Sequence, residues 1–220
     1  MKIKQVKQIK QAATVAAAAL LLAGCGTTAG YKQADKTGAG IAEMRAEIVN
    51  SQKAVNQTVQ ALEQVAATAN TNPRKAFEQY AKSVSNLESA ADKARKRSEE
   101  MKARGQAYFK QWEQQLAEVK NPEIRQLAEQ QKAKLQATFD RIKQYAEPLK
   151  AKFDPWLSDL KDLKTYLSND LTIGGVDAAK SLFAKTQAEG VEVQKSMDAL
   201  VGELNTVAAT LTPANVEQKK

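Results

Sequence analysis

An all-α protein is the fold class that the sequence predicts: an elongated antiparallel bundle of three to four long helices with coiled-coil-like heptad packing. Apolar residues recur in alternating steps of three and four over most of the chain, which puts them on one face of each helix. Proline and glycine interrupt this pattern at few points, and no strand-like alternating run stands between hairpin signals. Because short connections favour antiparallel neighbours, one bundle domain suffices.

The first residues have the composition of a secretory signal peptide. Their basic region carries four lysines: Lys2, Lys4, Lys7 and Lys10. The apolar stretch at 12–23 follows and holds 12 residues, whereas a membrane-spanning helix needs about 20. We therefore expect residues 1–24 to be a signal peptide that is removed.

The tetrapeptide Leu22-Ala23-Gly24-Cys25 resembles the bacterial lipobox. By that resemblance, lipid is attached to the Cys25 thiol, the chain is cut before it, and the new amino terminus is acylated. Several acyl chains anchor stably, because each buried methylene contributes about 0.8 kcal/mol. The residue after Cys25 is Gly26 and not an aspartate, which resembles the pattern of lipoproteins that are sorted by default to the outer membrane. We therefore expect a lipid-anchored envelope protein facing the periplasm. The alternative is an ordinary secretory signal with an incidental cysteine.

The composition of the mature chain fits a protein that folds by helix packing alone. Cys25 is the only cysteine, so no internal disulfide can form in an oxidising compartment. Removal of residues 1–24 takes away four lysines and no acid, which lowers the formal net charge from +8 to +4. The apolar residues are few, but their regular placement argues against disorder.

The helical bundle domain is expected over residues 41–212. The preceding residues 25–40 contain four glycines and few apolar side chains, which is typical of a flexible tether. The first helix is predicted over residues 41–70 and ends before Pro73. Its seam consists of Ile41, Met44, Ile48, Ser51, Val55, Thr58, Leu62 and Val65.

A second helix is predicted from Pro73 to Val119. Its seam is Phe77, Tyr80, Val84, Leu87, Ala91, Ala94, Ser98, Met101, Gly105, Tyr108, Trp112, Gln115 and Val119. The small residues in the middle of this seam indicate either close helix approach or weak packing. Tyr108, Phe109 and Trp112 form an aromatic cluster that is either core or a ligand-binding patch.

A third helix is predicted to start at Asn121 as the cap and Pro122 as the first helical residue. Its seam is Ile124, Leu127, Gln131, Leu135, Thr138, Ile142, Tyr145, Leu149, Phe153, Trp156, Leu160, Leu163 and Leu167. Pro148 and Pro155 lie inside it. Since proline removes a helical hydrogen bond, we expect a kink or short break near residues 153–154.

The last helix is predicted from Val176 to Leu211, after a loop at residues 168–175 that contains two adjacent glycines. Its seam includes Ala179, Phe183, Thr186, Val193, Met197, Leu200, Leu204 and Val207. Pro213 ends the helix, and residues 213–220 are expected to be a polar tail.

Three segments carry a resemblance to a known family. They are residues 108–113 (Tyr-Phe-Lys-Gln-Trp-Glu), 153–157 (Phe-Asp-Pro-Trp-Leu) and 163–171 (Leu-Lys-Thr-Tyr-Leu-Ser-Asn-Asp-Leu). In this order behind a helical start, they resemble an uncharacterised proteobacterial family of helical envelope proteins, the domain of unknown function 2959. The resemblance covers nearly all of residues 40–210. It implies a helical fold and no activity.

The sequence argues against catalysis. It contains no histidine, which removes the commonest general base and the commonest zinc ligand. No phosphate-binding glycine motif surrounds Gly174 and Gly175, so that pair is interpreted as a loop. Carboxylate pairs such as Glu99 and Glu100 stand among lysines and are interpreted as solvated surface charge. We therefore expect no catalytic residues, no cofactor and no metal site.

One stretch is dense in cations and is a candidate anionic-ligand patch. The basic run at residues 93–104 consists of Lys93, Arg95, Lys96, Arg97, Lys102 and Arg104, with Asp92, Glu99 and Glu100 beside them. Such a run could bind anionic lipid head groups, lipid A phosphates or a cell-wall fragment. The alternative is a solvated helix face with ion pairs one turn apart. Nucleic acid is not an expected partner of an exported protein.

Three functions remain open at this point. The first is a structural or protein-interaction lipoprotein that is held at the membrane by its lipid and contacts an unidentified envelope protein. The second is a binding module for an anionic envelope ligand, and the third is an enzyme built from carboxylates alone, the least favoured of the three. Polar seam positions would also permit a homo-oligomer, in which some seams are completed between chains.

Overall fold

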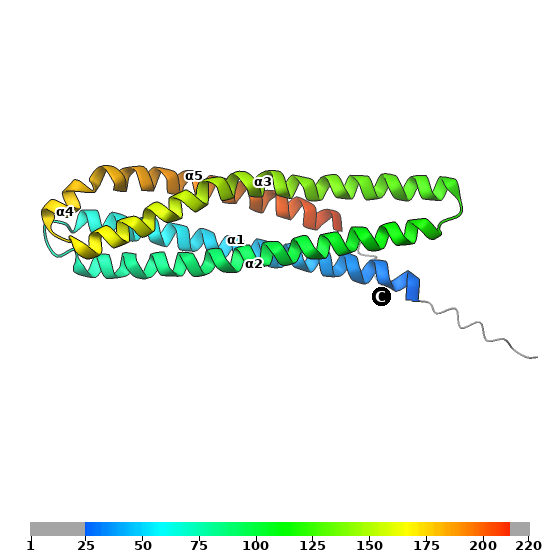
Figure 1. The fold of residues 1–220 in the computed structure, drawn as a ribbon, viewed down its shortest axis with the longest axis horizontal. Helices are drawn as coiled ribbons and strands as arrows, with labels where there is room; N and C mark the ends of the chain where they lie inside the picture. The colour runs from blue at the N-terminus through cyan, green and yellow to red at the C-terminus, as the bar shows by residue number, and fades with distance from the viewer. Residues whose placement is uncertain (1–24, 212–220) are drawn as a thin grey trace, which may run out of the picture.

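The computed structural model describes residues 25–211, with side chains over residues 35–210. Five helices follow one another along these residues: α1 (Cys25–Ala67), α2 (Arg74–Glu118), α3 (Pro122–Asn169), α4 (Ile173–Ala178) and α5 (Lys180–Leu211). The described part contains no β-strand, which confirms the all-α class. Figure 1 shows four long helices side by side along one axis, with the short α4 at one end.

The four long helices form a closed ring around one core. Helix α1 packs against α2 and α5, and α3 packs against the same two neighbours. Consecutive long helices run in opposite directions, because short connections join them (Figure 1). The predicted elongated antiparallel bundle is therefore the observed architecture.

Local capping explains where the helices begin. The Asn121 side-chain oxygen accepts hydrogen bonds from the backbone N–H groups of Glu123 and Ile124, at 2.9 and 3.2 Å. Pro122 occupies the first turn of α3, where its missing N–H costs nothing. The hydroxyl of Thr172 accepts from the Gly175 N–H at 3.1 Å and caps α4. The loop predicted at residues 168–175 is shorter than expected, since α3 continues to Asn169 and α4 begins at Ile173.

The predicted seam of the first helix lies in the core. All eight of its members are buried, including Ser51 and Thr58. Both hydroxyls donate to the backbone oxygen four residues earlier, Ser51 to Glu47 at 2.9 Å and Thr58 to Ala54 at 2.8 Å. A polar side chain can therefore occupy the seam without leaving a buried hydroxyl donor unpaired.

Two aromatic side chains join the helices across the core. The Tyr80 hydroxyl on α2 donates to the Leu160 carbonyl oxygen on α3 at 2.7 Å. The Trp156 indole N–H on α3 donates to the Thr186 carbonyl oxygen on α5, also at 2.7 Å. Both side chains are almost fully buried. Their polar atoms find partners on neighbouring helices, as buried tyrosine and tryptophan usually do.

The two internal prolines do not interrupt α3. The helix is continuous through Pro148 and Pro155, so the alternative of a short break is wrong. Figure 1 shows α3 changing direction between its green and yellow parts, where these prolines lie. A missing hydrogen bond and ring crowding account for such a bend.

The flexible tether expected over residues 25–40 is a wrong prediction. Helix α1 begins at Cys25 and runs through all of these residues. Thr37 is buried and lies four positions before Ile41, so it extends the seam by one step. Gly40 is also buried, and a β-carbon there would lie 3.1 Å from Nη1 of Arg104. The glycines therefore permit close packing of α1 on α2 instead of marking a loop.

The start of the α3 seam is exposed, contrary to the sequence prediction. Ile124 and Leu127 are 55% and 61% exposed, although both were assigned to the core. The ion pair between Arg141 and Glu203 helps to set the register between α3 and α5. In this register Leu211, the last residue of α5, lies opposite about residue 133 of α3. Residues before that point have no α5 beside them.

The predicted signal peptide at 1–24 and the polar tail at 213–220 lie outside the described residues.

Candidate functional site

A long groove runs between α2 and α3. It has a volume of about 1110 Å³ and opens to solvent along the two helices. We call it the α2–α3 groove and define it by its lining: Ala91, Ala94, Arg95, Ser98, Glu99, Met101, Lys102, Gly105, Gln106, Phe109, Lys110 and Glu113 of α2; Gln136, Phe139, Asp140, Ile142, Lys143, Ala146, Glu147, Leu149, Lys150, Phe153 and Asp154 of α3; and Met44, Ile48, Ser51, Met197 and Leu200 of α1 and α5. Ligand sites in helical bundles commonly lie between helices in this way.

The groove exists because one wall is made of small side chains. Ala91, Ala94 and Ser98 present little volume to α3, so the space between the helices is not filled. At Gly105 the helices come close, since a β-carbon there would lie 3.3 Å from Cε1 of Phe139. The sequence allowed either close helix approach or weak packing in this stretch. The structure shows close approach at Gly105 and open packing at Ala91, Ala94 and Ser98.

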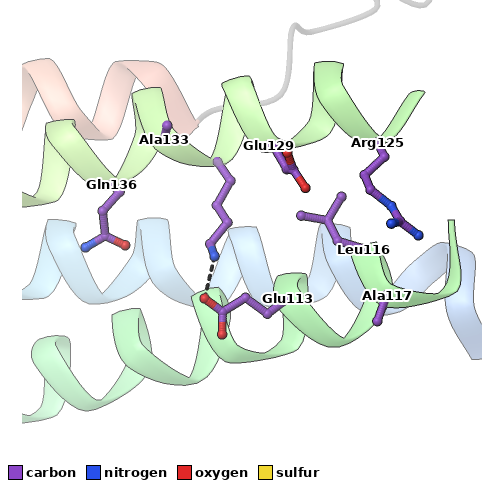
Figure 2. Close-up of a pocket in the computed structure, with 8 residues that line it drawn as sticks. Glu113, Leu116, Ala117, Arg125, Glu129, Ala133 and Gln136 are labelled. Atoms are coloured by element: carbon purple, nitrogen blue, oxygen red, sulfur yellow. Dashed lines mark hydrogen bonds and ion pairs between the residues drawn. The ribbon is translucent and has the colours of Figure 1, made fainter. Parts of the chain in front are cut away.

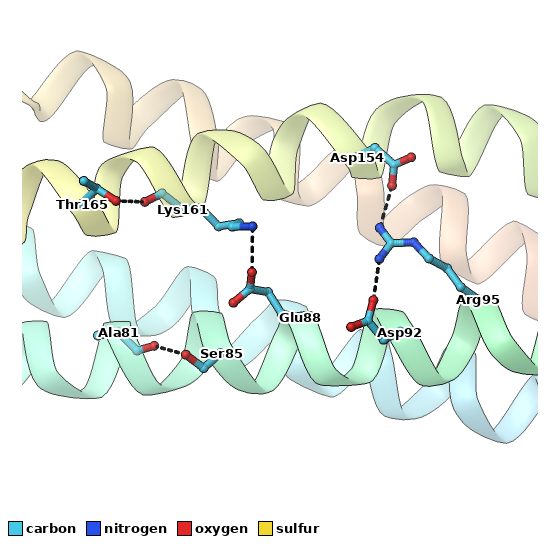
Figure 3. Close-up of polar contacts among 8 residues, drawn as sticks. All are labelled: Ala81, Ser85, Glu88, Asp92, Arg95, Asp154, Lys161 and Thr165. Atoms are coloured by element: carbon cyan, nitrogen blue, oxygen red, sulfur yellow. Dashed lines mark hydrogen bonds and ion pairs between the residues drawn. The ribbon is translucent and has the colours of Figure 1, made fainter.

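An ion pair spans each end of the groove. At one end Nη2 of Arg95 on α2 lies 2.9 Å from Oδ1 of Asp154 on α3 (Figure 3). At the other end Lys132 of α3 pairs with Glu113 of α2 (Figure 2). These contacts hold the two helices together on both sides of the opening.

The Asp154 carboxylate receives two cations. Nζ of Lys150 lies 2.8 Å from its second oxygen. The hydrogen bond from Lys150, and after it the one from Arg95, lowers the pKa of Asp154 below its ordinary value. In return, the hydrogen bond to Asp154 raises the pKa of Arg95. The pair is therefore fully charged at neutral pH.

The rim of the groove is charge-balanced. It carries five cations and five acids: Arg95, Lys102, Lys110, Lys143 and Lys150 against Glu99, Glu113, Asp140, Glu147 and Asp154. Between the two ends, the rim pairs stay within one helix. Lys102 lies 3.9 Å from Glu99, and Lys143 lies 3.5 Å from Glu147. The middle of the groove is thus not bridged by any ion pair of the described residues.

The six cations of the basic run do not form one surface. Arg95 points to α3, whereas Arg97 and Arg104 pair with Glu43 of α1 at 3.0 and 3.2 Å. Lys102 lies on the groove rim. Lys93 and Lys96 are exposed and belong to no ion pair within residues 35–210. Four of the six cations therefore hold acidic groups of the bundle, on different sides of α2.

The aromatic cluster belongs in part to the groove. Phe109 is buried, lines the groove, and meets Phe139 of α3 edge to face, with ring centroids 5.5 Å apart. Tyr108 contacts Phe109 and Trp112 at 5.6 Å each and remains half-buried. Burial raises the pKa of the Tyr108 hydroxyl. The sequence left open whether this cluster is core or a ligand-binding patch. Phe109 both packs in the core and forms part of the groove wall.

A second hollow lies at the α2–α3 turn, beyond the Glu113–Lys132 pair (Figure 2). It has a volume of about 560 Å³, and its lining includes Leu116, Arg125 and Glu129. Arg125 closes the turn, because its Nη2 donates to the Val119 carbonyl oxygen at 2.6 Å. We call residues 113–133 the hairpin end. It includes the exposed Ile124 and Leu127.

The blue start of α1, the helix that begins at Cys25, lies at the same end of the bundle as the hairpin end (Figure 1). Gly40 of α1 packs on Arg104 of α2, and the two helices are antiparallel. Cys25 lies 15 residues before Gly40 on α1, and Val119 lies 15 residues after Arg104 at the end of α2. Each of these stretches is about 22 Å long. The residue predicted to carry lipid is therefore level with the α2–α3 turn.

Within the described residues, no group of three or more acids, cysteines or histidines could hold a metal ion. None of the helices over residues 25–211 is long and apolar enough to cross a membrane.

The α3 wall of the groove was not singled out from sequence. Phe139, Lys143 and Lys150 line it, yet in the sequence they read as ordinary members of an amphipathic helix. The available signal was the run of small residues on α2 facing large residues on α3. Pairing the two seams in antiparallel register would have revealed that mismatch.

Comparison with known proteins identifies a family but no activity. A family model described as "Protein of unknown function (DUF2959)" matches residues 27–211. No curated protein and no solved structure matches the chain. The match covers almost the whole described bundle. The chain therefore belongs to the DUF2959 family of proteins of unknown function.

Proposed function

We propose that this protein is a lipid-anchored lipoprotein of the bacterial envelope, held at the outer membrane and facing the periplasm, which acts through protein interaction and not through catalysis. The observation that carries the proposal is the position of Cys25. This residue closes a lipobox-like segment and is also the first residue of α1. A lipid on Cys25 would be joined directly to the bundle.

The hairpin end is the surface that we propose for contact with an envelope partner. It lies level with Cys25, so a membrane anchor would hold it close to the bilayer and to proteins embedded there. Ile124 and Leu127 lie on this surface with more than half of their area exposed. Exposed apolar residues that are grouped together commonly mark interaction sites.

An interaction role also agrees with the chemistry of the side chains. The chain has no histidine, and the carboxylates at both ends of the groove are held in ion pairs. Four cations of the basic run are engaged in the same way. Binding of an anion by the whole run is therefore the weaker alternative, because it would require these pairs to break.

Metabolic labelling tests the anchor. Growing cells are supplied with a palmitate analogue, and wild type is compared with Cys25→Ala and with the control Gly202→Ala, which leaves the lipobox-like segment intact. We expect label and outer-membrane retention in wild type and control, and the loss of both in Cys25→Ala. An unlabelled wild type, or a Cys25→Ala variant that stays in the membrane, would contradict the proposal.

Photo-crosslinking tests the contact surface. A photoreactive amino acid replaces Leu127 at the hairpin end or, as the matched control, Leu182, which is 50% exposed near the opposite end of the bundle. We expect a discrete adduct with one envelope protein from position 127 and none from position 182. An adduct with a second copy of this chain would identify a homo-oligomer instead. No adduct from position 127 would reject the hairpin end as the interaction surface.

A further inference from the structure

We propose that the α2–α3 groove binds an acyl chain of a zwitterionic phospholipid. The inference goes beyond the proposed interaction role and rests on it only for the envelope location that would supply the lipid. It assigns a ligand class to this cavity. Between the Arg95–Asp154 pair and the Glu113–Lys132 pair, no ion pair of the described residues crosses the groove.

The floor of the groove is apolar and reaches the core. Met44 and Ile48 of α1 and Leu200 of α5 lie at its base, and Phe109 and Ile142 contribute to its walls. Its volume of about 1110 Å³ lies just above the roughly 300–1,000 Å³ that is usual for small-molecule sites. An apolar ligand would cover surface that is continuous with the bundle core.

The length of the groove fits an extended ligand. From Gln136 to Asp154 the groove follows α3 for 18 residues, which is about 27 Å. The Arg95–Asp154 pair at 2.9 Å and the Glu113–Lys132 pair join α2 to α3 at its two ends. A ligand that lies between these pairs leaves both of them intact.

The chemistry of the floor separates an acyl chain from an extended peptide. A peptide would bring one N–H and one C=O group per residue, and each of these needs a hydrogen-bond partner when buried. Met44, Ile48 and Leu200 offer no such partner through their side chains. The hydroxyl of Ser51 beside them already donates to the Glu47 carbonyl oxygen. A hydrocarbon chain has no polar groups to satisfy.

The rim indicates which head group the chain carries. Both cations and acids lie along it, and in the register set by Arg95 and Asp154 two further facing positions have opposite charge. Glu99 faces about residue 150, a lysine, and Lys102 faces about residue 147, a glutamate. A head group with both an ammonium and a phosphate can pair with both kinds of rim charge. A free carboxylate would meet as many acids as cations.

Binding of single-chain lipids to the purified mature protein tests the inference. Lysophosphatidylethanolamines with chains of increasing length are titrated by calorimetry below their micellar concentrations. We expect saturable binding, with about fourfold higher affinity for each added methylene that is buried. Fatty acids of the same chain lengths should bind at least several-fold more weakly. Absence of a chain-length dependence, or tighter binding of the fatty acid, would overturn the proposal.

Two leucine substitutions provide the decisive pair. Ala94→Leu enlarges a residue of the small α2 wall and so fills the groove, whereas Gly202→Leu adds a leucine side chain where no atom lies within 4 Å of a β-carbon. We expect at least a tenfold loss of lysophosphatidylethanolamine affinity for Ala94→Leu and no change for Gly202→Leu. If Ala94→Leu loses its helical circular dichroism, Ser98→Leu replaces it with the same expectation. Wild-type affinity in a folded groove variant would reject the site.

The outcomes are separable from those of the labelling experiment. Failure of lipid binding by purified protein, with palmitate label still on Cys25, would reject the groove ligand and leave the anchored lipoprotein intact. Binding in the groove without label on Cys25 would give the reverse result.

Discussion

Tyr80 and Leu160 join α2 to α3 through a buried hydrogen bond of 2.7 Å between the phenol hydroxyl and the backbone carbonyl oxygen. Burial raises the pKa of Tyr80 well above its ordinary value, so the hydroxyl stays protonated and remains a donor. Further along the same two helices, the Arg95–Asp154 pair marks the point where they separate around the groove. The Tyr80 contact thus belongs to the end of the bundle where α2 and α3 are tightly joined.

Tyr80→Phe is expected to lower the free energy of unfolding by about 0.5–1.5 kcal/mol, the usual net contribution of one hydrogen bond. Urea unfolding followed by far-UV circular dichroism measures the change. Tyr145→Phe is the control, because Tyr145 is 39% exposed and its hydroxyl can bond to water. Equal losses in both variants would show that the buried bond contributes nothing specific.

Replacing each of two glycines of α5 by alanine should change the free energy of unfolding in opposite directions. A β-carbon at Gly190 would lie 2.9 Å from Cγ2 of Val59 and 3.2 Å from Cζ2 of Trp156. A β-carbon at Gly202 would have no such atom within 4 Å. Gly190→Ala should therefore destabilise the bundle by about 1–3 kcal/mol through overpacking. Gly202→Ala should stabilise it by up to about 1 kcal/mol, because alanine favours helix. Thermal unfolding of both variants distinguishes the signs, and a stabilising Gly190→Ala would contradict the close packing.

Asp154→Asn should have an effect that depends on pH. The lowered pKa of Asp154 means that its ionised form stabilises the fold above its ordinary pKa of 3.8, and this contribution is lost as the pH falls below that value. The side chain is 37% exposed, so we expect a loss of at most about 1 kcal/mol at pH 7. Unfolding curves of wild type and variant should converge on acidification. Asp140→Asn is the control, because Asp140 is in no ion pair of the described residues; a difference that persists in acid would contradict the expectation.

Glu43→Gln should loosen the first part of α1. Glu43 accepts from both Arg97 and Arg104, and these contacts hold α1 to α2 near Gly40. We expect amide exchange over residues 35–45 to become about fivefold faster, which corresponds to about 1 kcal/mol of local stability. Glu63→Gln, an exposed change on the same helix, should leave it unaffected. Unchanged exchange in Glu43→Gln would indicate that apolar packing alone orders this segment.

The sequence predicted the bundle well where a helix packs on one continuous seam. Alternating three and four steps identified Ile41 to Val65 as core, and all of these positions are buried. Periodicity is a local property, so it does not record how far a neighbouring helix extends. Ile124 and Leu127 keep the period but lie beyond the end of α5, which is why they are exposed.

Two other features depended on pairing that a single helix does not reveal. The glycines before Ile41 have the composition of a linker, yet Gly40 allows α1 to approach Arg104 closely. The groove likewise results from small residues such as Ala94 meeting a wall that contains Phe139 and Phe153. The charge density of the basic run was evident, but the division of Arg95 and Arg97 between α3 and α1 followed only from the assembled fold.

Helix α1 is continuous from Cys25 to Ala67, a length of about 65 Å. A flexible linker after Cys25 would let the bundle rotate independently of that residue, but α1 has no break over these residues. A change in the tilt of the first turn of α1 therefore also moves the opposite end of the bundle, where α4 lies (Figure 1). The protein is built so that the orientation of one end dictates the direction in which the other end points.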